Sequence, residues 1–192
     1  LVKIGVYAYA RLFDFTFRID NKFTLIVPII AGISALITAG CALAATDLKR
    51  VIAYSTVSQL AFILLGMSAG NSLALEGGML YIMVHSIGKG GLFLCAGIVE
   101  HNLHTPDLTK MGGLIKTMPW TAAAFLLNAF SIMGIPPFGG FFAKFLVIDG
   151  AFSSGNTAIG IIFTIGAVMT LLYLLRLFKM VFLGPEKCPG VH

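Results

Sequence analysis

Long apolar runs separated by short polar connections make up most of this chain. The run at residues 23–45 predicts a complete membrane-spanning helix, about 34 Å long at 1.5 Å per residue. Similar helices are predicted at 51–69, at 78–99 and at about 156–182, and residues 1–13 predict the second half of another. Helices in lipid tolerate the glycines inside these runs, whereas a transmembrane barrel needs short alternating segments. The pattern therefore predicts an all-α polytopic membrane protein with about six to seven transmembrane segments.

Polar stretches connect these segments. They lie at residues 15–22, 46–50, 70–77 and 100–118. Thr46 or Asp47 is placed to cap the helix that follows, because both side chains can accept a hydrogen bond from a free backbone amide. The last stretch is the longest, and we expect it to lie along the membrane surface.

The region 119–152 is less regular than the others. Two apolar stretches, 120–133 and 141–152, flank a short segment of prolines and glycines. Because proline removes a backbone donor and clashes with the preceding turn, this segment predicts a broken helix. The residues that predict the break are Gly134, Pro136, Pro137 and Gly139. Either one long helix is broken in mid-membrane, or two shorter helices meet there.

Composition supports a membrane location. Of the 192 residues, 58% are hydrophobic and 11% are charged, and the mean hydropathy is +0.95. A soluble domain has about a quarter of its residues charged, because it needs a polar surface. The net charge of +5 comes from cations spread singly or in pairs, without the basic cluster typical of nucleic-acid binding. We therefore expect a lipid bilayer around a single transmembrane domain, residues 1–192, and no nucleic-acid partner.

Lys89 lies in the middle of the predicted helix 78–99, near the membrane midplane. A lysine there costs at least ~2.5–3.5 kcal/mol, so it indicates a function. His85 precedes it by one turn, which places both side chains on one face of the helix. Because histidine titrates near neutral pH, the two groups can exchange protons through a short water chain. In the structural alternative, Lys89 neutralises a buried carboxylate and His85 bonds to a backbone carbonyl.

Lys144 follows the proline break within an apolar run. Backbone groups freed by a broken helix are tolerated in a membrane only against protein or water, so a cation beside them indicates an ion path. Asp149, further along, is a candidate partner or exit acid. The alternative for Lys144 is a lysine at a helix end that extends to the membrane surface. Lys3 could equally be a flanking charge, and Lys49 fits an interfacial anchor better than a relay.

Metal and cofactor sites are not expected in this chain. His101 and His104 have spacing that could bind a metal, but they lack a third ligand at helical spacing, so a solvated loop is favoured. No haem, iron–sulfur or nucleotide motif is present. No CxxC pair occurs among the cysteines, which are Cys41, Cys95 and Cys188. We therefore expect no bond chemistry in the chain itself.

Four stretches together carry a resemblance to a known family. They are TDLKRVIAYSTVSQ at 46–59, VHSIGKGGLFL at 84–94, KMGGL at 110–114 and GIPPFGGFFAK at 134–144. In order and spacing they resemble the antiporter-like membrane subunits of the complex I superfamily. That superfamily includes NADH:quinone oxidoreductase, membrane-bound group 4 hydrogenases and Mrp-type Na⁺/H⁺ antiporters. The similarity extends over nearly the whole chain.

The resemblance implies a fold of about fourteen helices with two inverted repeats. Residues 1–22 would be the tail of the first repeat, 23–152 the core of the second, and 153–192 the C-terminal helix and tail. The family pairs the equivalent of Lys3 with a glutamate on an upstream helix that this chain lacks. We therefore expect the chain to be the C-terminal half of a longer protein.

The resemblance also implies roles for the buried cations. Lys3 and Lys144 would be equivalent lysines on two broken helices, and His85, Lys89 and Lys49 would link them in a buried polar axis. Position 144 is lysine in some members of the family and glutamate in others. No residue in this axis is implied to perform catalysis on a substrate.

The function expected from this resemblance is proton, or Na⁺ and proton, translocation in a redox-driven complex of a prokaryotic cell membrane. The driving chemistry, of the NADH:quinone oxidoreductase or hydrogenase type, would use iron–sulfur clusters and flavin or nickel–iron in partner subunits. Three alternatives stay open. They are a subunit of an Mrp-type Na⁺/H⁺ antiporter, a stand-alone secondary transporter with the proline break as its substrate site, and a structural scaffold with ion-paired lysines.

Overall fold

The computed structural model describes residues 2–16, 23–155 and 157–185, and within them every regular element is a helix. The α-helices are α1 (Ile4–Tyr9), α2 (Phe23–Ala44), α3 (Leu48–Ser68), α4 (Ser72–Leu103), α5 (Pro119–Met133), α6 (Gly139–Ser153) and α7 (Thr157–Phe182). A π-helical turn, Ala10–Asp14, extends α1, and a 3₁₀ turn, Leu108–Lys110, follows α4. Most of the predicted connector at 15–22 lies outside the described residues. The all-α prediction is confirmed.

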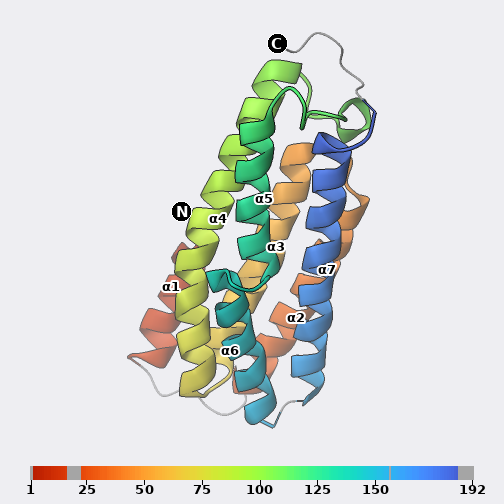
Figure 1. Ribbon diagram of the computed structural model, residues 1–192. Coiled ribbons are helices and arrows are strands. Elements are labelled where there is room, and N and C mark those ends of the chain that lie inside the picture. Colours follow the sequence, from red (N-terminus) through yellow and green to blue (C-terminus); the bar gives the residue numbers. More distant parts are fainter. Residues whose placement is uncertain (1, 17–22, 156, 186–192) are drawn as a thin grey trace.

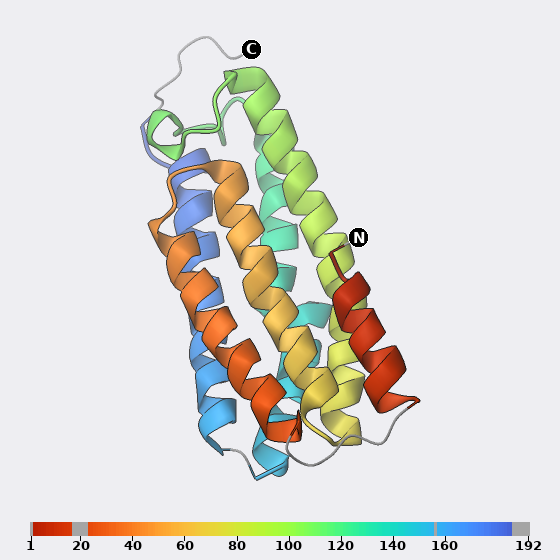
Figure 2. The ribbon, with the colours of Figure 1, turned by 180° about the vertical axis from the view of Figure 1, so that it is seen from behind.

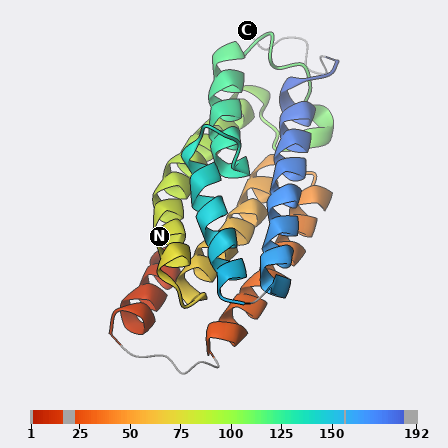
Figure 3. The same ribbon diagram turned by 60° about the horizontal axis from the view of Figure 1, so that its bottom comes forward.

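Four helices, α2, α3, α4 and α7, are long and apolar enough to cross a membrane. They run along a common axis, and the shorter α5 and α6 follow one another along that axis between α4 and α7 (Figures 1 and 3). Both short helices pack against α4 and α7. The predicted break between Gly134 and Gly140 is therefore confirmed, and it interrupts one crossing in mid-bundle.

Capping side chains determine where α3 and α4 begin. Asp47 precedes α3, and its Oδ1 accepts a hydrogen bond of 2.9 Å from the Arg50 amide, as predicted. Asn71 precedes α4, and its Oδ1 accepts a bond of 2.8 Å from the Ala74 amide. The link predicted at 70–77 is wrong after Asn71, because α4 already begins at Ser72.

Close packing around two glycines explains why α4 begins earlier than predicted. Gly77 and Gly78 lie inside α4, where they allow neighbouring helices to approach. A Cβ added at Gly77 would lie 2.8 Å from the Val147 amide nitrogen of α6, and one at Gly78 would lie 3.3 Å from the Cα of Gly66 on α3. Small residues at crossing points are typical of helix packing in membranes. In this chain these glycines mark a packing contact instead of a turn.

Two apolar clusters fill the interior of the bundle, and a polar layer lies between them. One cluster contains Ile52, Leu92 and Tyr173, and the other contains Phe62 and Phe163. Along each of the helices α3, α4 and α7, buried polar residues fall between members of the two clusters. These residues are Ser55, Ser58, Gln59, His85, Lys89 and Thr170. The fold therefore places polar side chains at mid-height in a lipid-surrounded bundle.

Gly66→Ala tests the close contact between α3 and α4. A Cβ at this position would lie 2.7 Å from the Ala74 carbonyl oxygen and 2.8 Å from the Gly78 Cα, so the two backbones must separate. We expect a lower midpoint of thermal unfolding in detergent, corresponding to a loss of about 1–3 kcal/mol. Gly90→Ala is the matched control, because its Cβ would meet nothing within 4 Å. Equal midpoints for the two variants would contradict this account of the packing.

Candidate functional site

Lys89 lies on the inner face of α4, with only 5% of its surface exposed. Its Nζ donates to Ser55 Oγ on α3 and, at 3.2 Å, to the Ile52 carbonyl oxygen. Ser55 Oγ in turn donates to that same carbonyl at 2.8 Å. The Lys89 ammonium group is therefore solvated by a hydroxyl and a backbone dipole of the neighbouring helix, and neither of these groups carries a compensating charge.

His85 lies one turn before Lys89 and is 1% exposed. Among the described residues, neither of its ring nitrogens has a hydrogen-bond partner. It lies within electrostatic range of three lysines, Lys89, Lys3 and Lys144. A buried imidazole with unused nitrogens, placed among cations, can accept or release a proton when a neighbouring charge changes.

Lys3 reaches the same region from outside α4. Its Nζ donates to Ser86 Oγ at 2.7 Å, and Ser86 Oγ donates to the Ile82 carbonyl at 2.6 Å. The short helix α1, which begins directly after Lys3, lies beside the lower half of α4 (Figure 2). Ser86 is adjacent to His85 in the chain, so α4 carries contacts to both Lys3 and the buried interior.

Lys144 lies on α6 directly after the break and is 4% exposed. Its Nζ lies 3.5 Å from the carbonyl oxygen of Met133, the residue at which α5 ends. The same nitrogen lies 4.9 Å from the ring centroid of Phe62 and 5.7 Å from that of Tyr81. A carbonyl at a helix end and two aromatic faces thus surround this cation.

A network of polar side chains, centred on Gln59 of α3, lies between the two buried lysines. Its Nε2 donates to Thr170 Oγ1 at 3.0 Å and to Tyr173 Oη at 2.9 Å, both on α7. Tyr81 Oη of α4 donates to Gln59 Oε1. The Tyr173 hydroxyl also faces the hydroxyl of Ser55, which binds Lys89. Hydrogen-bonding groups therefore extend from Lys89 to Tyr81, whose ring lies beside Lys144.

The members of this network were not among the site residues predicted from the sequence. Two signals could have found them. Tyr81, His85 and Lys89 recur at intervals of four residues, which places them on one face of α4. Ser55 and Gln59 have the same spacing on α3, and in the sequence analysis both entered only as part of the family resemblance.

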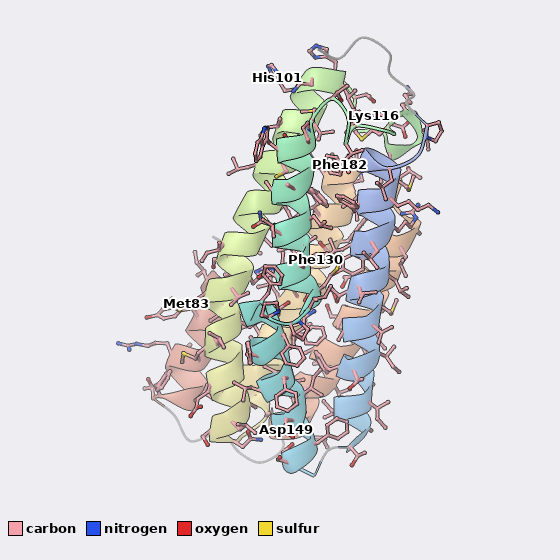
Figure 4. The ribbon with its side chains drawn as sticks, viewed as in Figure 1. Met83, His101, Lys116, Phe130, Asp149 and Phe182 are labelled. Carbon is pink, nitrogen blue, oxygen red and sulfur yellow. The ribbon has the colours of Figure 1, made fainter. Side chains whose placement is uncertain are left out.

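Asp149 lies beyond Lys144 on α6. Both residues line a cavity of about 330 Å³ between α6 and α7, which is otherwise lined mainly by apolar side chains such as Phe145 and Ile148. Asp149 is exposed and lies toward the lower end of the bundle (Figure 4). The cavity therefore connects the buried cation with an acidic group near one end of the bundle.

Lys49 lies apart from this group of residues. It is at the start of α3, and its Nζ forms an ion pair of 2.7 Å with Glu100 Oε2. With Glu100, His101 and His104 it lines a polar cavity of about 420 Å³. His101 and Asp149 lie at opposite ends of the bundle (Figure 4). The structure brings together Lys3, His85, Lys89 and Lys144. It places Lys49, His101 and His104 apart from them, at the end of the bundle opposite Asp149.

These observations define the class of the protein: it is a polytopic α-helical membrane protein with a broken helix and with buried lysine and histidine side chains inside the bundle. The family model described as the transmembrane region of NADH:quinone oxidoreductase and Mrp antiporter proteins matches residues 1–170. The chain belongs to this family.

Curated relatives come from two kinds of complex. The chain is 38% identical over 188 residues to a Na⁺/H⁺ antiporter protein of Alkalihalophilus pseudofirmus, covering 97% of this chain and 38% of that protein. It is 36% identical over 190 residues to the L subunit of NADH-quinone oxidoreductase of Rickettsia conorii, covering 97% of this chain and 28% of that protein. The chain thus spans well under half the length of these relatives.

Solved structures agree with this assignment. A chain of the Mrp complex from Dietzia superimposes with a TM-score of 0.93 at 32% identity, covering 99% of this chain and 36% of that chain. A chain of respiratory complex I from Thermus thermophilus gives a TM-score of 0.89 at 27% identity, covering 98% of this chain and 40% of that chain. An archaeal membrane-bound sulfane sulfur reductase gives 0.90 at 26% identity, covering 96% of this chain and 32% of that chain.

Gln59→Leu tests the buried network. The substitution removes the partner of the Tyr81 hydroxyl and two donated bonds to α7, and each buried polar group left unsatisfied costs about 1–3 kcal/mol. We expect a clear decrease in the thermal unfolding midpoint in detergent. Thr56→Val is the control, because the one bond of the Thr56 hydroxyl within the described part of the chain goes to the Ile52 carbonyl of its own helix, at 2.9 Å. If the unfolding midpoint of Gln59→Leu is no lower than that of the control, the network does not stabilise the bundle.

Proposed function

We propose that this chain carries protons across the bilayer along the row Lys3, His85, Lys89 and Lys144, as part of a multisubunit membrane complex. The observation that supports this proposal best is the environment of the two buried lysines. Lys89 and Lys144 contact a hydroxyl, backbone carbonyls and aromatic faces. Ammonium groups held in this way can lose a proton without leaving a carboxylate unpaired.

The first step is transfer from Lys89 towards Lys144. The Ser55 hydroxyl accepts a hydrogen bond from Lys89 and can pass a proton to water, because a hydroxyl is both donor and acceptor. The amide of Gln59 does not relay protons in this scheme. Instead, it holds the hydroxyls of Tyr81 and Tyr173 in fixed positions, around which water can order.

The second step is release from Lys144. The cavity shared by Lys144 and Asp149 gives this proton a route toward one end of the bundle. Asp149 would accept it near the membrane surface. Arrival of a proton at Lys144 and departure from Lys89 are coupled, because like charges repel strongly in a low-dielectric interior.

A change of charge near Lys3 would start each cycle. Lys3 lies within electrostatic range of His85, so its protonation state affects that imidazole and, through it, Lys89. In a redox-driven complex this change would originate in partner subunits that contain iron–sulfur clusters and flavin or a nickel–iron centre. The chain itself would hold none of these groups.

A second candidate function is Na⁺/proton exchange in an Mrp-type antiporter. Two observations favour it, namely the 38% identity to a Na⁺/H⁺ antiporter protein and the TM-score of 0.93 to a chain of an Mrp complex. The same residues would serve both functions, with proton movement coupled to Na⁺ movement in place of redox chemistry. The bacterial and archaeal sources of the relatives support a prokaryotic cell membrane as the location.

Lys89→Ala and Lys144→Ala test the proton path. Each removes a titratable group from the proposed route, so proton uptake into vesicles containing the assembled complex should fall to background. Uptake is followed with a pH-sensitive dye. Lys116→Ala is the control, because Lys116 is exposed in the loop before α5 (Figure 4).

Assembly of each variant is measured in parallel by size-exclusion chromatography, since an unfolded variant would also fail to transport. Normal uptake by both variants, in complexes of normal size, would refute the proton path. Loss of uptake in the Lys116→Ala control would indicate a general effect of removing surface charge.

Partner subunits distinguish the two candidate functions. We expect the protein containing this chain to purify within a complex, and mass spectrometry of its subunits identifies the type. Companions with iron–sulfur clusters and a hydrogenase or NADH-oxidising module would support redox-driven pumping. Companions of the Mrp type alone would support Na⁺/proton exchange. A protein that transports protons in isolation would contradict both and favour a stand-alone transporter.

A further inference from the structure

The C-terminal end of α7 forms a basic cavity that is separate from the proton path. It has a volume of about 300 Å³ and is lined by Arg176, Lys179 and apolar or small residues of α7, of the segment directly after α7 and of the loop after α4. No acidic residue is among the described residues that line it. A cavity with two cations and an apolar wall suits a ligand that is anionic at one end and apolar at the other.

Arg176 can donate further hydrogen bonds to such a ligand. It is half-buried, and its Nη1 donates at 3.2 Å to the Ala45 carbonyl, at the end of α2. A guanidinium group has five N–H donors, and its planar geometry matches phosphate. The bond to Ala45 fixes the direction of the side chain and leaves the remaining donors for other acceptors. Lys179 is exposed, one turn closer to the end of the helix.

An apolar stripe leads directly to this cavity along α7. Its members are Ile161, Ile165, Val168, Leu172 and Leu175, which are between 41% and 56% exposed. Their spacing of three and four residues continues to Lys179, so all six side chains share one face of the helix. α7 lies at the outer edge of the bundle in Figures 1 and 3. The stripe therefore lies on the outer surface of the described bundle, and the basic cavity lies at its end.

The length of the stripe fits one acyl chain. Half of a hydrocarbon core about 30 Å thick corresponds to about ten helical residues at 1.5 Å each. Residues 165–175 of the stripe cover this distance. A free phosphate ion would use the cations alone, whereas a phospholipid would use the cations and the stripe together.

We infer that the end of α7 is a binding site for an anionic phospholipid, whose phosphate lies between Arg176 and Lys179 and whose acyl chain follows Leu175 and Leu172. The bound lipid would belong to one leaflet and would lie against α7, with its headgroup at the membrane surface. It lies at the opposite end of α7 from the cavity of Asp149, so lipid binding and proton release are separate properties.

The test is native mass spectrometry of the intact, assembled protein after delipidation. It is titrated with phosphatidylglycerol or with phosphatidylcholine of identical acyl chains, which differ in net charge. We expect stronger binding of phosphatidylglycerol, weakened about fivefold by Lys179→Gln and about thirtyfold by the double variant with Arg176→Gln, because each surface cation contributes a similar amount. Lys116→Gln, at the same end of the bundle but outside the cavity, should bind as the unchanged protein does.

Three results would overturn the inference. One is equal binding of the two lipids, and another is an equal loss in the Lys116→Gln control. The third is displacement of phosphatidylglycerol by millimolar inorganic phosphate, which would make this a phosphate site without a lipid. Lys179→Gln alone keeps the test valid if Arg176→Gln fails to assemble, because Lys179 is exposed at the surface.

Discussion

The burial of ammonium groups in a lipid-surrounded bundle is the constraint on which the rest of this structure depends. A lysine at the bilayer centre is costly, and a hydroxyl, a carbonyl or an aromatic face offsets only part of that cost. Each of these groups must therefore be held where the cation needs it. Ser55 meets Lys89 because α3 and α4 cross closely, and the Met133 carbonyl faces Lys144 because α5 ends there. The close glycine contacts and the broken helix thus position the groups that stabilise the two buried lysines.

The polar layer divides the interior into two apolar clusters, and this division bears on the proposed function. A continuous apolar core would pack well but would leave no route for a proton. A continuous polar core would fill with water and destabilise the bundle in lipid. The observed arrangement gathers most of the buried polar residues at mid-height, where Gln59 joins α3, α4 and α7 through side-chain bonds. The same few residues would thus serve both the stability of the bundle and the proposed proton transfer, so substitutions there should rarely affect one property alone.

The helices could be predicted well from the sequence, because apolar run length in a membrane protein is a strong signal. The break at Gly134–Gly140 and the Asp47 cap could be predicted too, since both follow from local backbone chemistry. The start of α4 was placed too late, because Gly77 and Gly78 look like a connector until their contacts with α6 and α3 are known. The network around Gln59 was missed for the same reason. The role of Gln59 is evident only from its hydrogen bonds to Tyr81 and Tyr173, which lie on two other helices.

The two ends of the bundle carry different chemistry, and that asymmetry limits how the buried row can work. Lys49 is neutralised by Glu100 at one end, where His101 and His104 also lie, while Asp149 lies near the other end, on the far side of Lys144. In the proposed path, a proton leaving Lys89 would meet the hydroxyls held by Gln59 before it reached Lys144, and the cavity that Lys144 lines also reaches Asp149. A second proton arriving at Lys89 would place a cation behind protonated Lys144, and repulsion between the two lysines would then favour release at the Asp149 end. The direction of transfer would then follow from the order of the groups along the path, with no single residue acting as a one-way valve.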